Sequence, residues 1–291
     1  MNLLYITFGK EPSIYLQASF SIYSFLAQPQ GVQSVNIITD SANHYQHLAP
    51  HVNIILMTEK ELNAWKGEHQ FFWRIKLKAI EKICQLYPNQ PVMYVDCDTY
   101  LFGDISILQN SLKAGIALMH DNEGYLSARK NKTQQNMWKQ IAGKTFGAIA
   151  MLPTHNMWNA GLVATPNTQN AADAALAITI CDEMCRAGIT RYFIEQYALA
   201  LSLDKYYGIK EAKSEIVHYW SAKEIWNKQL GDFFMRAYFA QWKEAEIIEA
   251  MRNFDTSKLP AFQRVKNTNQ RLKNVVDKWF PNKNIEYLRR K

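Results

Sequence analysis

The sequence feature that most constrains the fold is the stretch from Pro91 to Asp104, which reads PVMYVDCDTYLFGD. Its apolar run from Val92 to Val95 follows a proline and predicts a short strand covered on both faces. Asp96 and Asp98 come where this strand should end, and residues two apart on an extended backbone point the same way. We therefore expect both carboxylates to reach one site at the edge of a sheet.

A divalent metal is the ligand that this pair of carboxylates favours. Two adjacent anions repel each other unless a cation lies between them. Hard oxygen ligands at the carboxyl end of a strand suit Mg²⁺ or Mn²⁺ holding a diphosphate. The alternative is a solvated turn that happens to contain Asp-X-Asp. Because open α/β sheets bind ligands outside the carboxyl ends of their strands, the position favours the metal site.

Length and composition are those of a globular chain. The 291 residues suffice for one large α/β domain with an appendage, and 48% of them are hydrophobic against 20% charged. The sequence has no run of about eighteen uncharged apolar residues, and its N-terminal apolar stretch is too short for an export signal. We therefore expect a cytoplasmic protein. Its four cysteines have no zinc-site spacing and are expected to be reduced.

The net charge of +7 lies in the C-terminal tail. From Phe254 to Lys291 there are ten Lys or Arg against three Asp or Glu, and subtracting these from totals of 33 and 26 leaves 23 of each sign. Basic and aromatic residues along a helical tail suit an anionic membrane surface, with a solvated helix as the alternative. The balanced remainder carries no nucleic-acid-binding motif, so we expect no nucleic-acid partner.

The Asp-X-Asp strand resembles that of nucleotide-sugar glycosyltransferases of the GT-A fold, and is most similar to the retaining glycogenin and lipopolysaccharide galactosyltransferase group. The resemblance implies an α/β fold with a mixed, mostly parallel sheet flanked by helices. Residues 1–225 would form the nucleotide-sugar-binding and catalytic domain. Residues 226–291 would form a helical extension, with a helix from Gly231 to Asn253 and a basic, amphipathic tail from about residue 254.

The same resemblance implies a set of metal ligands. Asp98 would bind the metal directly, and Asp96 would bridge the metal and the ribose. His218 follows a short apolar strand and resembles the third protein ligand of the family. Neutral imidazole suits Mn²⁺ better than Mg²⁺, so Mn²⁺ is the expected ion. Lys223 matches the phosphate-contacting lysine of the related pattern only with a shift in spacing.

Four residues are candidate nucleoside contacts. In the family the end of the first strand meets the nucleobase and ribose, which here implicates Thr7, Phe8 and Gly9. An ordinary first strand is the alternative. Asp40 ends the second predicted strand and could accept a hydrogen bond from a base or ribose, although a helix N-cap explains it about as well.

Further donor contacts are implied on a helix and on a later strand. The predicted helix from Phe71 to Tyr87 carries Arg74, which matches an arginine that touches the donor phosphates or sugar in related transferases. A solvated helix face is the alternative for Arg74, and more so for Lys76 and Lys78. Asn159-Ala160-Gly161 precedes an apolar strand. In the family this asparagine binds sugar hydroxyls, and the small residues let the backbone approach the donor.

Glu195 and Gln196 are the candidate catalytic residues. They resemble the acid-Gln pair beneath the donor sugar's reactive carbon in the retaining group, where an amide or carboxylate can stabilise an oxocarbenium-like cation. Glu195 could instead act as a general base in an inverting reaction, or hold a sugar hydroxyl. Because helical neighbours do not share a face, one of the two is expected to point away. The acid is Glu where the family has Asp, and no second Asp follows Gln196.

Together these features predict a metal-dependent glycosyltransferase, retaining rather than inverting. It would move a sugar from a nucleotide-diphosphate donor, with a UDP-sugar favoured, to a glycan or lipid-linked acceptor in surface polysaccharide or lipopolysaccharide synthesis. A sugar nucleotidyltransferase shares this sheet topology, although the loop from Gly9 to Pro12 is too short for the glycine-rich loop of that class. Two non-enzymatic classes are alternatives to the glycosyltransferase. One is a nucleic-acid-binding protein, and the other is a non-catalytic protein at the inner face of the cell membrane.

Overall fold

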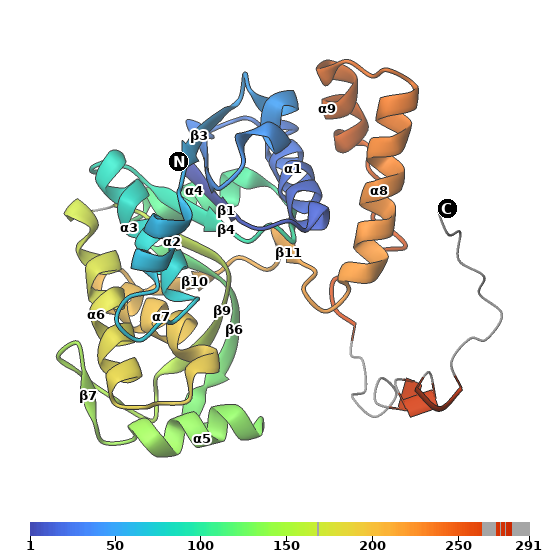
Figure 1. Cartoon of the computed structure of the whole chain (residues 1–291). Coiled ribbons are helices and arrows are strands. Elements are labelled where there is room, and N and C mark those ends of the chain that lie inside the picture. Colours follow the sequence, from blue (N-terminus) through green and yellow to red (C-terminus); the bar gives the residue numbers. More distant parts are fainter. Residues whose placement is uncertain (168, 264–271, 274, 277, 281–291) are drawn as a thin grey trace.

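The computed structural model describes residues 1–167, 169–263, 272–273, 275–276 and 278–280 (Figure 1). Its main sheet contains seven strands: β1 (Asn2–Thr7), β2 (Ser34–Thr39), β3 (Val52–Leu56), β4 (Val92–Val95), β6 (Ala117–Tyr125), β9 (Asn156–Thr165) and β10 (Ile209–Glu211). They lie in the order β10-β6-β9-β4-β1-β2-β3. Two smaller sheets pair β5 (Thr99–Leu101) with β11 (Ile216–His218), and β7 (Thr145–Phe146) with β8 (Ile149–Ala150).

Helices cover both faces of the main sheet. They are α1 (Pro12–Leu26), α2 (Glu59–Trp65), α3 (Arg74–Leu86), α4 (Ile105–Lys113), α5 (Lys132–Ile141), α6 (Ala172–Arg186), α7 (Ile194–Tyr206), α8 (Lys223–Phe239) and α9 (Glu244–Arg252). Short 3₁₀ turns are η1 (Ala42–Leu48), η2 (Leu126–Ala128), η3 (Gln169–Ala171) and η4 (Arg191–Phe193). Helices α3, α6 and α7 pack into one apolar core, and α1, α4, α8 and α9 pack into the other (Figure 1). This arrangement confirms the predicted α/β class.

Strand β4 is the central strand that its apolar sequence predicts. All four of its residues are buried, because β1 and β9 flank it and a core covers each face. The sheet is mixed and mostly parallel, as expected: β1 pairs in parallel with β2 and β4, whereas β9 runs antiparallel to both β4 and β6. Because β9 is reversed, its residue Gly161 lies beside the carboxyl end of β4, where its oxygen accepts from the backbone N–H of Asp96 at 2.9 Å.

The small β5–β11 sheet brings the end of the domain back to the Asp-X-Asp turn. Strand β5 begins one residue after Asp98, and in the antiparallel ladder His218 pairs with Thr99. The backbone N–H of Tyr219 then donates to the backbone oxygen of Asp98 at 3.0 Å. Residues that are distant in the sequence are therefore neighbours for reasons of strand pairing.

Two predicted helices have different ends in the structure. Helix α3 begins at Arg74 rather than at Phe71, because Phe71 to Trp73 form a turn whose Phe71 oxygen accepts from Arg74 N–H at 3.1 Å. The single helix predicted from Gly231 to Asn253 is two helices, α8 and α9. Helix α8 ends where Gln241 adopts a left-handed φ of 53° and Trp242 N–H reaches back to Ala237 O at 2.9 Å.

Helix α8 packs on α1, with the rings of Phe20 and Phe233 edge to face at 5.5 Å. The division of the chain at residue 225 remains a prediction. Most of the basic tail, including residues 264–271 and 281–291, lies outside the described residues.

Within the described part of the chain, no helix combines the length and apolarity needed to span a bilayer. All four cysteines are free, as expected.

Candidate active site

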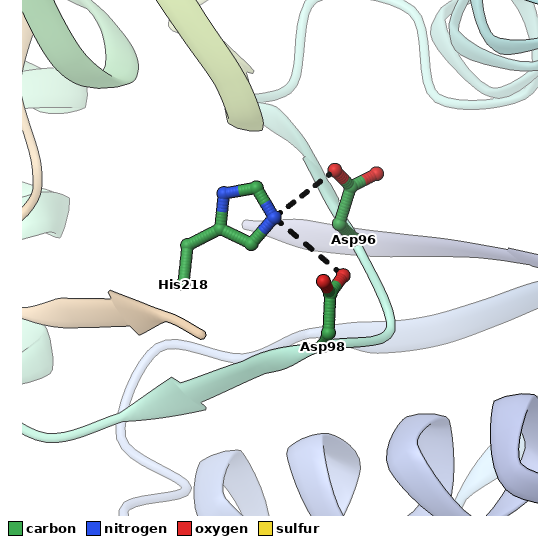
Figure 2. A group of neighbouring side chains, drawn as sticks. All are labelled: Asp96, Asp98 and His218. Carbon is green, nitrogen blue, oxygen red and sulfur yellow. Dashed lines mark ion pairs between the residues drawn. The ribbon is translucent and has the colours of Figure 1, made fainter. Parts of the chain in front are cut away.

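Asp96, Asp98 and His218 converge at the carboxyl end of β4 (Figure 2). The Nε2 atom of His218 lies 3.5 Å from Asp96 Oδ2 and 3.5 Å from Asp98 Oδ1, and one potential ligand atom from each residue lies within 4.8 Å of the others. Asp98 and His218 are buried. Two carboxylate oxygens and one imidazole nitrogen form a donor set that fits Mn²⁺ or Mg²⁺.

The orientation of Asp96 leaves one carboxylate oxygen for a metal. The hydroxyl of Tyr94 donates to Asp96 Oδ1, and the ammonium of Lys76 lies 3.4 Å from the same oxygen. Oδ2 therefore faces His218. Both residues that hold Asp96 are buried, so the carboxylate has a fixed direction.

Asp98 is held in its ionised form. Burial opposes ionisation, but the hydrogen bond and charge of His218 when its ring is protonated, together with the ammonium of Lys223, outweigh it and lower the pKa of Asp98. The Lys223 Nζ lies 2.9 Å from Asp98 Oδ2, and the lysine side chain is half exposed. Helix α8 begins at Lys223, which places this lysine at the site despite the shifted spacing of the sequence pattern.

Lys76, rather than Arg74, is the cation of helix α3 that reaches the site. Arg74 makes a bidentate ion pair with Asp182 of α6 at 2.7 and 2.9 Å and donates to Trp65 O at 2.9 Å. Because residues two apart on a helix point to different sides, Lys76 turns the other way and lines the cavity. Its Nζ lies 2.9 Å from Glu195 Oε1 and 3.2 Å from Ala160 O. The structure thus places the sequence-predicted Arg74 in an ion pair between helices.

The three candidate metal ligands line a cavity of about 510 Å³, a size that suits a small-molecule ligand. Of the remaining predicted site residues, the cavity is also lined by Phe8, Asn159, Ala160, Gly161, Glu195 and Gln196. Sequence reasoning missed several lining residues: Gln17, Phe72, Trp73, Lys76, Tyr94, Tyr192 and Trp220. These residues follow no motif, and only the folded loops and helix faces bring them together.

Thr7, Gly9 and Asp40 are not brought to the cavity wall. The Thr7 hydroxyl is buried, donates to the Thr39 hydroxyl at 3.1 Å and accepts from Tyr45. Gly9, with a left-handed φ of 99°, donates its N–H to Asp40 Oδ2 at 3.0 Å. Thr7 and Asp40 thus hold the loop after β1 in place, whereas Phe8, which lies between Thr7 and Gly9 in the sequence, lines the cavity.

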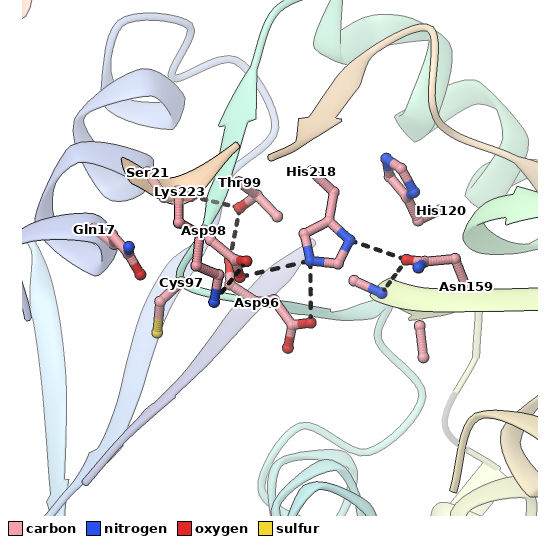
Figure 3. Close-up of polar contacts among 12 residues, drawn as sticks. Gln17, Ser21, Asp96, Cys97, Asp98, Thr99, His120, Asn159, His218 and Lys223 are labelled. Atoms are coloured by element: carbon pink, nitrogen blue, oxygen red, sulfur yellow. Dashed lines mark hydrogen bonds and ion pairs between the residues drawn. The ribbon is translucent and has the colours of Figure 1, made fainter. Parts of the chain in front are cut away.

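Asn159 contacts His218 (Figure 3), and Gly161 leaves room for its ring. The Oδ1 atom of Asn159 lies 3.0 Å from His218 Nδ1. A Cβ atom on Gly161 would lie 2.0 Å from the same nitrogen, so only a glycine leaves room for the imidazole ring. Gly161, which the sequence predicts to let the backbone approach the donor, thus makes room for the ring of a candidate metal ligand.

Glu195 and Gln196 lie in the first turn of α7, and both line the cavity. Helical neighbours differ by about 100° in direction, and the amide of Gln196 donates to Met157 Sδ at 3.2 Å. Glu195 is buried, which raises its pKa, while Lys76 opposes that rise. Burial disfavours the charge of Lys76, but Asp96 and Glu195 outweigh it and raise the pKa of the ammonium. One buried cation thus serves two acids.

Neither a protein-family model nor a curated protein sequence matches the chain. Among solved structures, it is similar to the galactosyltransferase LgtC in complex with donor and acceptor sugar analogues, with a TM-score of 0.46, 11% identity, and coverage of 72% of this chain and 73% of that one. An active-site mutant of LgtC gives a TM-score of 0.49 at 12% identity, with 72% of each chain covered. Mouse xyloside xylosyltransferase 1 in its apo form gives 0.44 at 10% identity, covering 72% of this chain and 85% of that one. These are likenesses of fold alone, and no residue role is transferred from them.

The buried Lys76–Glu195 pair gives a test of the site's electrostatics. Lys76→Met should lower the free energy of unfolding by about 3–5 kcal/mol, because Glu195 is left buried without its cation. Urea denaturation measures this loss. Since the unpaired carboxyl has a folded pKa above its unfolded value, the lost stability should return as the pH falls below that folded pKa toward the unfolded value.

Lys78→Met, on the same helix, is the matched control. Lys78 pairs with Glu81 near the surface, so its loss should cost less than about 1 kcal/mol. Adding Glu195→Gln to Lys76→Met should restore part of the stability. Equal losses for the two lysines, or no recovery in the double variant, would contradict the assigned pairing.

Proposed function

We propose that this protein is a metal-dependent glycosyltransferase that moves a sugar from a nucleoside-diphosphate donor to an acceptor hydroxyl. The observation that carries this proposal is the convergence of Asp96, Asp98 and His218 in the wall of the 510 Å³ cavity. A divalent ion held there would offset the negative charge of the departing nucleoside diphosphate. The imidazole among the ligands favours Mn²⁺ over Mg²⁺.

The residues around the metal ligands divide into a phosphate side and a sugar side. The half-exposed side chain of Lys223 places its ammonium next to Asp98, where it can bind phosphate oxygens. Glu195 and Gln196, a carboxylate and an amide residue, line the cavity. These two groups can hold sugar hydroxyls and stabilise positive charge at the reacting carbon, as in a retaining transfer. Lys76 fixes the direction of the Glu195 carboxylate.

The donor is proposed to be a UDP-sugar, with Phe8 contacting the nucleoside and the backbone of Ala160 and Gly161 next to the sugar. Each of these residues lines the cavity. Arg74 is not part of the proposed site, because its guanidinium donates hydrogen bonds to the carboxylate of Asp182 and the backbone oxygen of Trp65.

The acceptor is proposed to be a glycan. Phe72, Trp73, Tyr192 and Trp220 line the same cavity, and their exposed fractions are 51%, 48%, 73% and 51%. Exposed aromatic rings around a polar cavity mark a binding site. The flat C–H faces of a pyranose can pack on such rings while its hydroxyl edges meet Glu195 and Gln196. Synthesis of surface polysaccharide or lipopolysaccharide remains the proposed pathway.

Membrane association through the basic tail also remains a proposal, carried by the charge of residues 254–291. Exposed apolar side chains among the described tail residues include Leu272, Val275, Val276, Trp279 and Phe280. Their spacing of three and four residues puts them on one face if the segment is helical, which suits an anionic membrane surface.

Nucleotide binding should depend on the metal. UDP with Mn²⁺ should raise the melting temperature by about 5 °C at a UDP concentration near 100 times its Kd, and by much more than GDP or CMP. Thermal-shift measurement with and without Mn²⁺ tests this. The effect should vanish in Asp98→Ala, which loses a metal ligand. Equal stabilisation by UDP without metal would contradict the proposed role of the ion.

The product should keep the anomeric configuration of the donor. Proton NMR of a single turnover reads the anomeric coupling before the product can equilibrate. Retention is expected because a carboxylate and an amide line the cavity where they can stabilise an oxocarbenium-like cation. An inverted product would eliminate the retaining assignment and make Glu195 a general base.

Acceptor binding should depend on the exposed rings. Tyr192→Ala should raise the KM for a glycan acceptor about tenfold, a loss of about 1.4 kcal/mol, and should change the KM for the donor much less. Tyr238→Ala is the control, because Tyr238 is 78% exposed but lies near the end of α8. Equal effects of the two substitutions on acceptor KM would contradict the proposed acceptor site.

A further inference from the structure

The side chain of Asn159 makes two contacts that together determine where His218 carries its hydrogen. Asn159 Oδ1 lies 2.9 Å from the backbone N of Gly161 and 3.0 Å from His218 Nδ1 (Figure 3). A backbone N–H only donates, so the asparagine atom that faces it must be the oxygen. The side-chain amide therefore has one orientation that fits this site.

The same oxygen determines the tautomer of His218. An amide oxygen only accepts, so the hydrogen between it and His218 must lie on Nδ1. In neutral imidazole the second nitrogen, Nε2, then carries a lone pair. That lone pair faces Asp96 Oδ2 and Asp98 Oδ1, each 3.5 Å away. Three electron-pair donors thus point at one place, an arrangement that a cation stabilises.

We propose that Asn159 is a positioning residue that holds His218 in the Nδ1–H tautomer, so that Nε2 is ready to bind the metal. The proposal rests on the metal site of the proposed function. It gives Asn159 a role different from the sugar contact that the sequence pattern implies. Replacing a group that hydrogen-bonds the second nitrogen of a metal-binding histidine typically lowers the metal affinity 10-fold to 100-fold.

Gly161 completes the arrangement. Its N–H fixes Asn159, its oxygen accepts from the backbone N–H of Asp96 at 2.9 Å, and its missing side chain admits the ring of His218. The ring of His120 also stands edge to face with that of His218, at 5.2 Å. The Asn159–Gly161 segment therefore sets the distance between a carboxylate ligand and the imidazole ligand.

The test compares Mn²⁺ binding to full-length variants by titration calorimetry, without any sugar donor. Asn159→Ala should raise the Kd for Mn²⁺ about 10-fold to 100-fold. Asn159→Asp keeps an oxygen that accepts from both N–H groups, so its Kd should stay at or below that of the wild type. Asn156→Ala is the matched control, because Asn156 lies on the same strand but not in the cavity wall, and its Kd should be unchanged.

The tautomer itself is read by ¹⁵N NMR of His218 in the metal-free protein, at a pH where the ring is neutral. A hydrogen on Nδ1 is expected in the wild type and in Asn159→Asp. A hydrogen on Nε2 in the wild type would overturn the proposal, even if Asn159→Ala failed to fold.

The outcomes separate this proposal from the proposed function. Equal Mn²⁺ affinity of Asn159→Ala and the wild type would overturn the role of Asn159 and leave the metal site intact. A wild type that binds no Mn²⁺ would instead refute the metal site, and the NMR result would still decide the tautomer.

Discussion

The mutual repulsion of Asp96 and Asp98 is the constraint on which the rest of the site depends. With Glu195, they bring three carboxylates to the cavity, and the two ammonium groups of Lys76 and Lys223 leave one net negative charge if His218 is neutral. A divalent ion would reverse that sign and make the cavity attractive to a diphosphate. The two ammonium groups thus supply enough positive charge for the chain to fold around the three carboxylates, but too little to neutralise them.

Strand order turns this electrostatic pattern into a site. Because β9 is antiparallel between β4 and β6, the residues that enter it lie beside the carboxyl end of β4. The β5–β11 ladder adds the imidazole of His218 from a distant part of the chain. Two short pairings therefore fix three ligands and the asparagine that orients one of them. Loops supply much of the remaining cavity wall, including the exposed aromatic rings of Trp73 and Tyr192.

The sequence predicts the elements and side chains whose positions follow from a local residue pattern. It misses those whose positions depend on the exact residue at which a helix begins or ends. The apolar run of β4 and the spacing of Asp96 and Asp98 predict a central strand with both acids at its end. The choice between Arg74 and Lys76 depends on where α3 begins and which side of it faces the cavity, and composition does not reveal this. The break after α8 falls at Gln241, which adopts a left-handed φ that glycine usually marks. Lys223 reaches the site although its spacing differs from the related pattern, because helix α8 starts there.

Anomalous X-ray diffraction from crystals soaked in Mn²⁺ tests the central claim most directly, because it locates the ion without reference to activity. We expect one anomalous peak, bonded to an oxygen of Asp96, an oxygen of Asp98 and Nε2 of His218. A protein–metal distance of about 2.0–2.3 Å is expected for each ligand, by analogy with divalent first-row and hard cations. A peak elsewhere on the chain, or none at saturating Mn²⁺, would contradict it.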